Sequence, residues 1–179
     1  MQFIILLALI LSLTAWIVSS YHRLEQLRIL ANSKWQLVLA SLHRRNSAVR
    51  ELVYRLGTQN EQDMLLRQLR HIQGDYELSL SSPKNLRHPT QQLQQIARYE
   101  DKLSHLLREL TSHAAQAPQL QYCFEQVQQF DQARLLSIKQ YNAAVTAYRH
   151  QRELPPYRQL AQLAQQPDLL TWETRELLR

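Results

Sequence analysis

The segment Phe3–Val18 constrains the fold of this chain more than any other, because its sixteen residues contain only two polar side chains. With the next three residues the segment covers about 19 positions, or roughly 28 Å at 1.5 Å per residue, which matches a hydrocarbon core of about 30 Å. Trp16 and Tyr21 fall near its end, where amphipathic rings favour the membrane interface. We therefore expect residues 1–20 to form a single transmembrane anchor.

A cleaved signal peptide is the alternative for this segment. Signal peptides place a positively charged start before an apolar region of about 7–15 residues. No basic residue precedes Phe3, although Val18-Ser19-Ser20 resembles a weak cleavage site made of small residues. The charge-free start and the longer apolar run favour an anchor that stays on the protein.

Basic residues follow the apolar segment but do not precede it. Arg23, Arg28 and Lys34 lie within about 15 residues of its end, and short flanks rich in Lys and Arg stay on the cytoplasmic side of a membrane. We therefore expect the N-terminus outside the membrane and the C-terminal body in the cytoplasm. The same three side chains are candidate contacts with the membrane surface, because they can pair with anionic lipid headgroups.

The charge of the chain fits this orientation better than it fits nucleic-acid binding. The formal net charge is +6. Residues 21–57 hold seven Lys or Arg against two Glu, a balance of +5 that leaves +1 for the rest of the chain. The sequence has no groove-reading motif and no basic run with interleaved aromatic residues. We expect a lipid bilayer as a partner and no nucleic acid.

The pattern of apolar residues predicts an all-α fold. Only two Gly and six Pro interrupt the 179 residues, and the apolar residues between them recur at steps of three and four, which is typical of helices that bury one face. Short connections favour a long antiparallel up-down four-helix bundle over residues 21–154. The expected helices span residues 21–56, 59–80, 90–116 and 119–153, and no signal breaks the first of them from the anchor.

Residue counts predict where the two outer helices of the bundle meet. Counting from the turn after the first helix puts Arg45 level with Asp131, and Trp35 level with Tyr141. Because Arg45 and Asp131 occupy core positions, we expect an internal ion pair; the alternative is that Arg44 and Arg45 bind an anionic partner. The second helix is too short to pass Trp35, so the outer helices should continue toward the membrane as a two-helix stalk.

The tail, residues 155–179, combines apolar, aromatic and basic side chains. We expect two short helical pieces in it, separated at Pro167. Its composition is typical of helices that lie on a membrane surface, so Trp172 and Arg175 are further candidate membrane contacts. The alternative is that the tail folds back on the stalk and buries its apolar residues there.

Short matches in a consistent order make the chain resemble a divergent member of the LemA family of bacterial membrane proteins. The matching residues are Tyr21-His22-Arg23-Leu24, Leu27-Arg28, Trp35, Leu42-His43-Arg44-Arg45, Glu51-Leu52-Val53, Leu120-Gln121, Asp131-Gln132, Tyr141 through Tyr148 (YNAAVTAY), Leu154-Pro155 and Trp172-Glu173. They cover both outer helices, whereas residues 56–118 match only in helical character. The family usually has Glu-Asn where this chain has Asp131-Gln132, and the usual Gly-Phe of the tail is missing.

The resemblance implies a single N-terminal span in a bacterial inner membrane, a cytoplasmic helical bundle and no catalytic activity. The family-matching or core residues are Trp35, Arg44, Arg45, Asp131, Tyr141, Asn142, Val145 and Tyr148. The expected function is a non-enzymatic interaction or scaffold module on the cytoplasmic face, whose protein partner is unknown. The alternative is an exported envelope protein whose bundle lies outside the cytoplasmic membrane.

The sequence offers no arrangement of residues for catalysis or metal binding. Its seven His include no pair at i, i+4, and it contains no Gly-rich phosphate loop or nucleophile elbow. Cys123 is expected to be a small buried side chain. The Tyr141-Asn142 pair is a candidate recognition site, but the position of Tyr141 on a buried stripe favours core packing. We expect no enzyme activity, cofactor, metal or small-molecule substrate.

Overall fold

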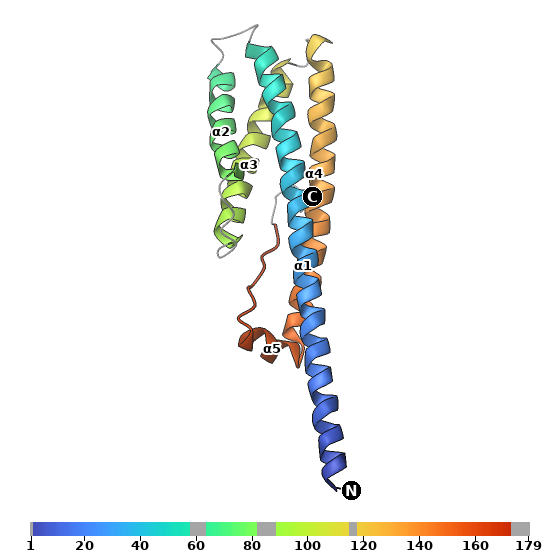
Figure 1. Ribbon diagram of the computed structural model, residues 1–179. Coiled ribbons are helices and arrows are strands. Elements are labelled where there is room, and N and C mark those ends of the chain that lie inside the picture. The colour runs from blue at the N-terminus through green and yellow to red at the C-terminus, as the bar shows by residue number, and fades with distance from the viewer. Residues whose placement is uncertain (1, 58–63, 82–88, 115–117, 173–179) are drawn as a thin grey trace. The chain divides into compact units, whose positions relative to one another are not determined.

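The chain is helical throughout most of the residues that the computed structural model describes, which are 2–57, 64–81, 89–114 and 118–172. These residues form five helices and no strand (Figure 1). The helices are α1 Gln2–Gly57, α2 Met64–Ser81, α3 Pro89–Ala114, α4 Pro118–Glu153 and α5 Tyr157–Leu163. The all-α class is confirmed, and the first helix continues from the apolar segment without a break.

The helix bounds agree with the expected ones wherever both are described. Residues 58–63, which include the expected start of the second helix, lie outside the described residues, as do residues 115–117. The third helix begins at Pro89, a residue whose fixed φ and missing N–H suit the first turn of a helix.

The first helix exposes its apolar start completely. Its large hydrophobic side chains between Phe3 and Val18 are exposed to fractions from 38% at Ile17 to 77% at Phe3. The most apolar 18-residue window of the helix has a mean hydropathy of 2.4. By length and composition α1 can therefore span a membrane, and it is the one helix of the described residues that can.

The chain divides into two compact units, and α1 and α4 contribute to both. The first unit comprises Met1–Trp35 and Gln140–Thr171, and the second comprises Gln36–Lys139 and Trp172–Arg179. Each is described below by itself.

In the first unit α1 and α4 pack in antiparallel directions. The Trp35 ring lies 5.3 Å from the ring of Tyr141 between centroids. Seven residues, or about two turns, further toward the N-terminus of α1, Arg28 lies close enough to Tyr148 to act on it electrostatically. Residues earlier in α1 therefore contact residues later in α4, as expected for antiparallel helices. The prediction that Trp35 and Tyr141 lie side by side on the two helices is confirmed.

Within the described residues the tail contains one helix, α5, and the second expected piece falls partly on residues outside the described ones. After α5 the chain turns at Gln165, whose φ of 48° is left-handed, and the N–H of Gln166 donates to the carbonyl of Ala161 at 2.9 Å. This is the hydrogen-bonding pattern of a Schellman C-cap. Residues 166–172 are then non-helical, because Pro167 lacks an N–H and disfavours a helical conformation in the residue before it. Residues 173–179 lie outside the described residues.

The second unit joins the C-terminal part of α1, the N-terminal part of α4, and the whole of α2 and α3. Helices α2 and α3 pack against each other (Figure 1). A buried amide connects α1 and α2, because Gln73 donates to the backbone carbonyl of Asn46 at 3.0 Å. The fully or almost fully buried apolar side chains of this unit include Val38, Leu42, Val49, Leu52, Leu69, Ile96, Leu103 and Ile138.

Candidate functional site

The most unusual feature of the second unit is a closed ring of four charged side chains in its interior. Glu100 on α3 accepts from Arg45 on α1 and from Arg134 on α4, each at 3.1 Å. Asp131 on α4 completes the ring, since it pairs with Arg45 and, at 3.3 Å, with Arg134. Positive and negative groups alternate around the ring, so its formal charge is zero. We call these four residues the charge ring.

Three of the four side chains of the charge ring are buried, and several hydrogen bonds link Arg45 to its neighbours. Arg45 and Glu100 each expose 1% of their side chains and Arg134 exposes 2%, while Asp131 exposes 33%. Arg45 donates to both carboxylate oxygens of Glu100 and also to the hydroxyl of Ser104 at 3.1 Å. Because a buried charge without a partner is strongly unfavourable, these contacts are what make four ionised groups tolerable in a helical core.

Tyr76 on α2 brings a fourth helix to the charge ring. Its side chain is fully buried. Burial and the neighbouring Glu100 carboxylate raise the pKa of the Tyr76 hydroxyl well above its ordinary value of 10.0, because both oppose a phenolate there. All four helices of the second unit therefore place a polar group at this point.

The sequence predicted only part of this ring. The ion pair expected between Arg45 and Asp131 is present, but Arg45 makes its best-buried contacts with Glu100. The apolar pattern of α3 runs Leu93, Ile96, Leu103, Leu107 and Leu110, with a gap where a core residue belongs; Glu100 fills that gap. A charged residue at a core position of α3, together with Arg134 on the buried stripe of α4, was the available signal.

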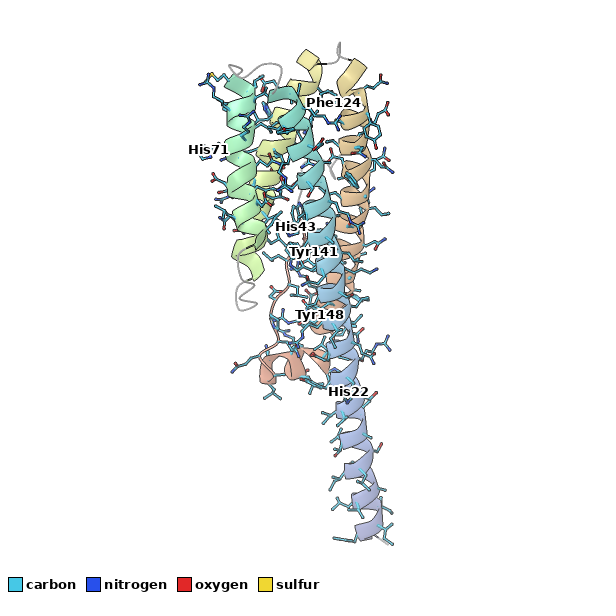
Figure 2. The ribbon with its side chains drawn as sticks, turned by 45° about the horizontal axis from the view of Figure 1, so that its top comes forward. His22, His43, His71, Phe124, Tyr141 and Tyr148 are labelled. Atoms are coloured by element: carbon cyan, nitrogen blue, oxygen red, sulfur yellow. The ribbon has the colours of Figure 1, made fainter. Side chains whose placement is uncertain are left out.

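In the first unit the tail folds back onto the helices. Figure 2 labels Tyr141 and Tyr148, which belong to α4. The Tyr141 hydroxyl donates to the carbonyl of Leu170 at 2.9 Å, and the Tyr148 hydroxyl donates to the carbonyl of Pro167 at 3.0 Å. Asp168 accepts from Arg152 at 2.9 Å. The two tyrosine bonds use backbone carbonyls and the arginine bond uses a side chain of residues 166–171, which we call the strap. Burial raises the pKa of Tyr141 to about 12.

The burial of Trp172 corrects the expectation that its ring contacts the membrane surface. A membrane contact needs an exposed ring, but the Trp172 side chain is only 1% exposed. Leu169, on the strap, is buried as well. Leu169 and Trp172 are therefore covered by protein, as in the alternative interpretation, whereas Leu163 on α5 is exposed. Arg175 lies outside the described residues.

The basic residues expected at the membrane surface differ in their partners. Arg28 pairs with Glu25 at 2.5 Å, and Lys34 donates to Gln140 at 3.2 Å. Arg23 is exposed. Arg28 and Lys34 thus contact the protein itself, whereas Arg23 faces outward.

The other family-matching residues divide between core and surface. Val145 and Tyr148 are fully buried and Tyr141 nearly so, in agreement with core packing. Asn142 is half-buried, and Arg44 is exposed and does not belong to the charge ring. Cys123 is buried, as its neighbours on the stripe predicted. In the described residues no three His, Cys, Asp or Glu side chains gather as metal ligands.

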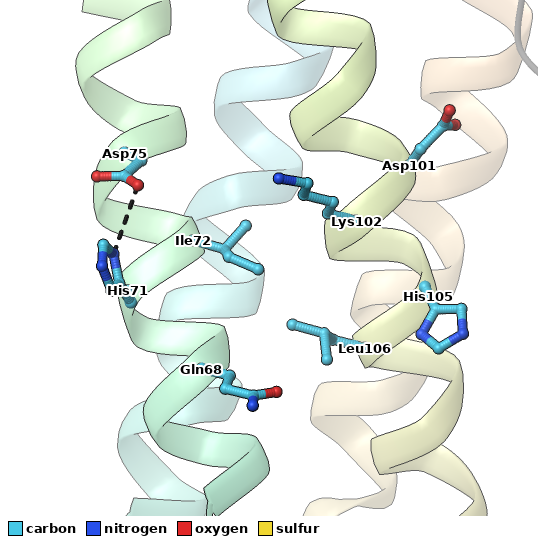
Figure 3. Close-up of a pocket in the computed structure, with 8 residues that line it drawn as sticks. All are labelled: Gln68, His71, Ile72, Asp75, Asp101, Lys102, His105 and Leu106. Carbon is cyan, nitrogen blue, oxygen red and sulfur yellow. Dashed lines mark ion pairs between the residues drawn. The ribbon is translucent and has the colours of Figure 1, made fainter.

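The face that α2 and α3 share carries an open groove of about 540 Å³. Half-buried Ile72 and Leu106 lie across from each other in it (Figure 3). Polar side chains surround this aliphatic floor, namely Gln68, His71, Asp75, Asp101, Lys102 and His105. His71 points away from the floor toward Asp75, with 3.4 Å between imidazole nitrogen and carboxylate oxygen.

Comparison with known proteins adds no relative to these observations. No model of a known protein family matches the chain. No curated protein matches it either.

Proposed function

We propose that this protein is a membrane-anchored, non-enzymatic interaction module whose helical body lies on the cytoplasmic face of a bacterial inner membrane. The observation that carries the proposal is the uncovered apolar start of α1, from Phe3 to Val18. An exposed apolar surface of that size is not stable in water and marks an interaction site or a membrane contact. The length of the segment and the Trp at its end favour a bilayer over a protein partner.

We further propose that the second unit is an antiparallel up-down four-helix bundle. Contacts between each pair of neighbouring helices support this arrangement: Asn46 with Gln73, α2 with α3, Glu100 with Arg134, and Arg45 with Asp131. Antiparallel α1 and α4 are supported by a second level, because Arg55 lies near Tyr122. The charge ring fits a scaffold role. Buried polar groups can select one packing among the alternatives open to an apolar core.

The orientation of the body is supported by Arg23, Arg28 and Lys34 after a charge-free start. The resemblance to the LemA family supports the same topology and a scaffold role. A pair of reporter fusions at Arg179 tests the cytoplasmic orientation. One reporter is active only in the cytoplasm, and the other is active only outside it. We expect activity from the cytoplasmic reporter alone. Activity from the outer reporter alone would instead assign the protein to the envelope outside the cytoplasmic membrane.

The groove between α2 and α3 is the surface that we propose for a protein partner. Its aliphatic floor and polar rim suit an amphipathic helix, which binds grooves through side chains at i, i+3 and i+4. A photo-crosslinking amino acid at Gln68 should yield one discrete adduct in cells, and Ile72→Asp should abolish it. The same probe at Gln128, which is exposed on α4, is the control. Equal adducts from both positions, or none from Gln68, would contradict this assignment.

A further inference from the structure

A hollow of about 550 Å³ lies along α1 immediately after the apolar segment. It is lined by Ser19, His22, Arg23, Gln26, Leu27 and Leu30. These residues recur at steps of three and four, so they share one face of the helix. The hollow begins one residue after Val18, the last residue of the exposed apolar segment.

The lining of the hollow combines polar side chains that can bind a phosphate with aliphatic side chains that can lie against lipid tails. Arg23 supplies a guanidinium, whose planar fork suits phosphate oxygens. Ser19 and Gln26 supply hydrogen-bond donors on the same face. No acidic side chain lines the hollow within the described residues, and Glu25, the nearest in sequence, is already engaged by Arg28 and Gln166.

Arg23 differs from Arg28 and Lys34 because its side chain is exposed and finds no partner among the described residues. In the part of the chain that the structure describes, Arg23 makes no ion pair or hydrogen bond. It lies two residues past Tyr21, where the roughly 28 Å span ends, or about 3 Å further along the helix axis. The headgroup layer occupies roughly the first 5–8 Å beyond the hydrocarbon core, so the guanidinium falls within the layer that holds the lipid phosphates.

We propose that this hollow is a binding site for the phosphate of an anionic phospholipid headgroup. The inference rests on the proposed membrane anchoring and adds a lipid class and a residue to it. The occupant follows from the continuity of the hollow with the membrane segment and from its positive, acid-free lining. Arg23 is the main contact, Ser19 and Gln26 are secondary contacts, and Arg28 and Lys34 are not part of the site.

Trp16 is a native reporter for this site, because it lies one turn before Ser19 on the same face of α1. The full-length protein is placed in bilayers that contain brominated phosphatidylglycerol or brominated phosphatidylcholine at equal fractions, and quenching of Trp16 fluorescence is measured. Trp35 and Trp172 also emit, so the signal of Trp16→Phe is subtracted. One basic residue near an anionic surface contributes about a fivefold preference. We therefore expect phosphatidylglycerol to quench Trp16 about fivefold more effectively than phosphatidylcholine.

Two variants separate a specific site from general attraction of charge. Arg23→Gln should reduce the preference to near onefold, whereas Lys34→Gln should leave it unchanged. Equal quenching by the two lipids in the unmodified protein, or equal losses in both variants, would overturn the site while leaving the anchor intact. Absence of quenching by either lipid would instead overturn the membrane anchor itself.

Discussion

Substitution of Glu100 by Gln tests how the charge ring is held in the second unit. The carboxylate of Glu100 is 1% exposed and accepts from both Arg45 and Arg134. Glu100→Gln conserves shape but leaves two buried guanidinium groups with Asp131 as their remaining carboxylate in the ring. Breaking a buried ion pair on one side costs about 3–5 kcal/mol. For a chain of this size that loss corresponds to a fall in Tm of roughly 6–20 °C.

The comparison with Asp131→Asn makes this prediction specific. Asp131 contacts the same two arginines, but its side chain is 33% exposed, so water can replace part of what is lost. We expect a smaller cost of about 1.5–3 kcal/mol, typical of a hydrogen bond to a charged group. The assay is thermal unfolding of the full chain in detergent, followed by circular dichroism. A loss below about 1 kcal/mol for Glu100→Gln, or a larger loss for Asp131→Asn, would refute the role of burial.

Three further predictions concern the strap, alkaline pH and the anchor. Tyr141→Phe removes the hydrogen bond to Leu170 and should cost about 1 kcal/mol locally, seen as roughly fivefold faster amide exchange in the strap with no change near Glu100; unchanged exchange would contradict the fold-back. Because the pKa of Tyr141 is raised to about 12 in the folded protein, its contribution to the free energy of unfolding is fully present below pH 10 and is lost as the pH rises toward 12. Up to about 3 kcal/mol of stability should disappear over that window. Tyr141→Phe should reduce this alkaline slope but not abolish it, because the pKa of Tyr76 is raised too; an identical slope in both proteins would disprove the role of Tyr141. Deletion of residues 2–20 should move the protein from carbonate-washed membranes to the soluble fraction, which fractionation and immunoblotting can detect.

Much of the fold followed from periodicity and residue counting. Gly57 and the prolines mark the ends of helices, and helical rise is constant, so one count along two antiparallel helices placed both Arg45 beside Asp131 and Trp35 beside Tyr141. Glu100 was missed for a physical reason. Counting residues along the outer helices gives the level of each side chain along the bundle, but it does not say which inner helix places a charged residue in the core. A single carboxylate among apolar residues is, moreover, usually a surface residue.

The tail was harder to predict because its composition serves two environments equally well. Leucine, tryptophan and arginine suit a membrane surface and also suit the side of a helix pair. What decides between them is the hydrogen bonding of the backbone. The carbonyls of Pro167 and Leu170 accept hydrogen bonds from the hydroxyls of Tyr148 and Tyr141, whereas the sequence pattern favoured core packing for both tyrosines and predicted no bond to the tail.

The central claim, a single anchor with a cytoplasmic body, is tested most directly by sided labelling of cysteines in intact bacterial cells. In a Cys123→Ser background, Gln2→Cys and Gln132→Cys are introduced separately and treated with a maleimide that does not cross the inner membrane. The account predicts labelling of Gln2→Cys in intact cells, and labelling of Gln132→Cys only after the membrane is permeabilised. Labelling of Gln132→Cys in intact cells would contradict it.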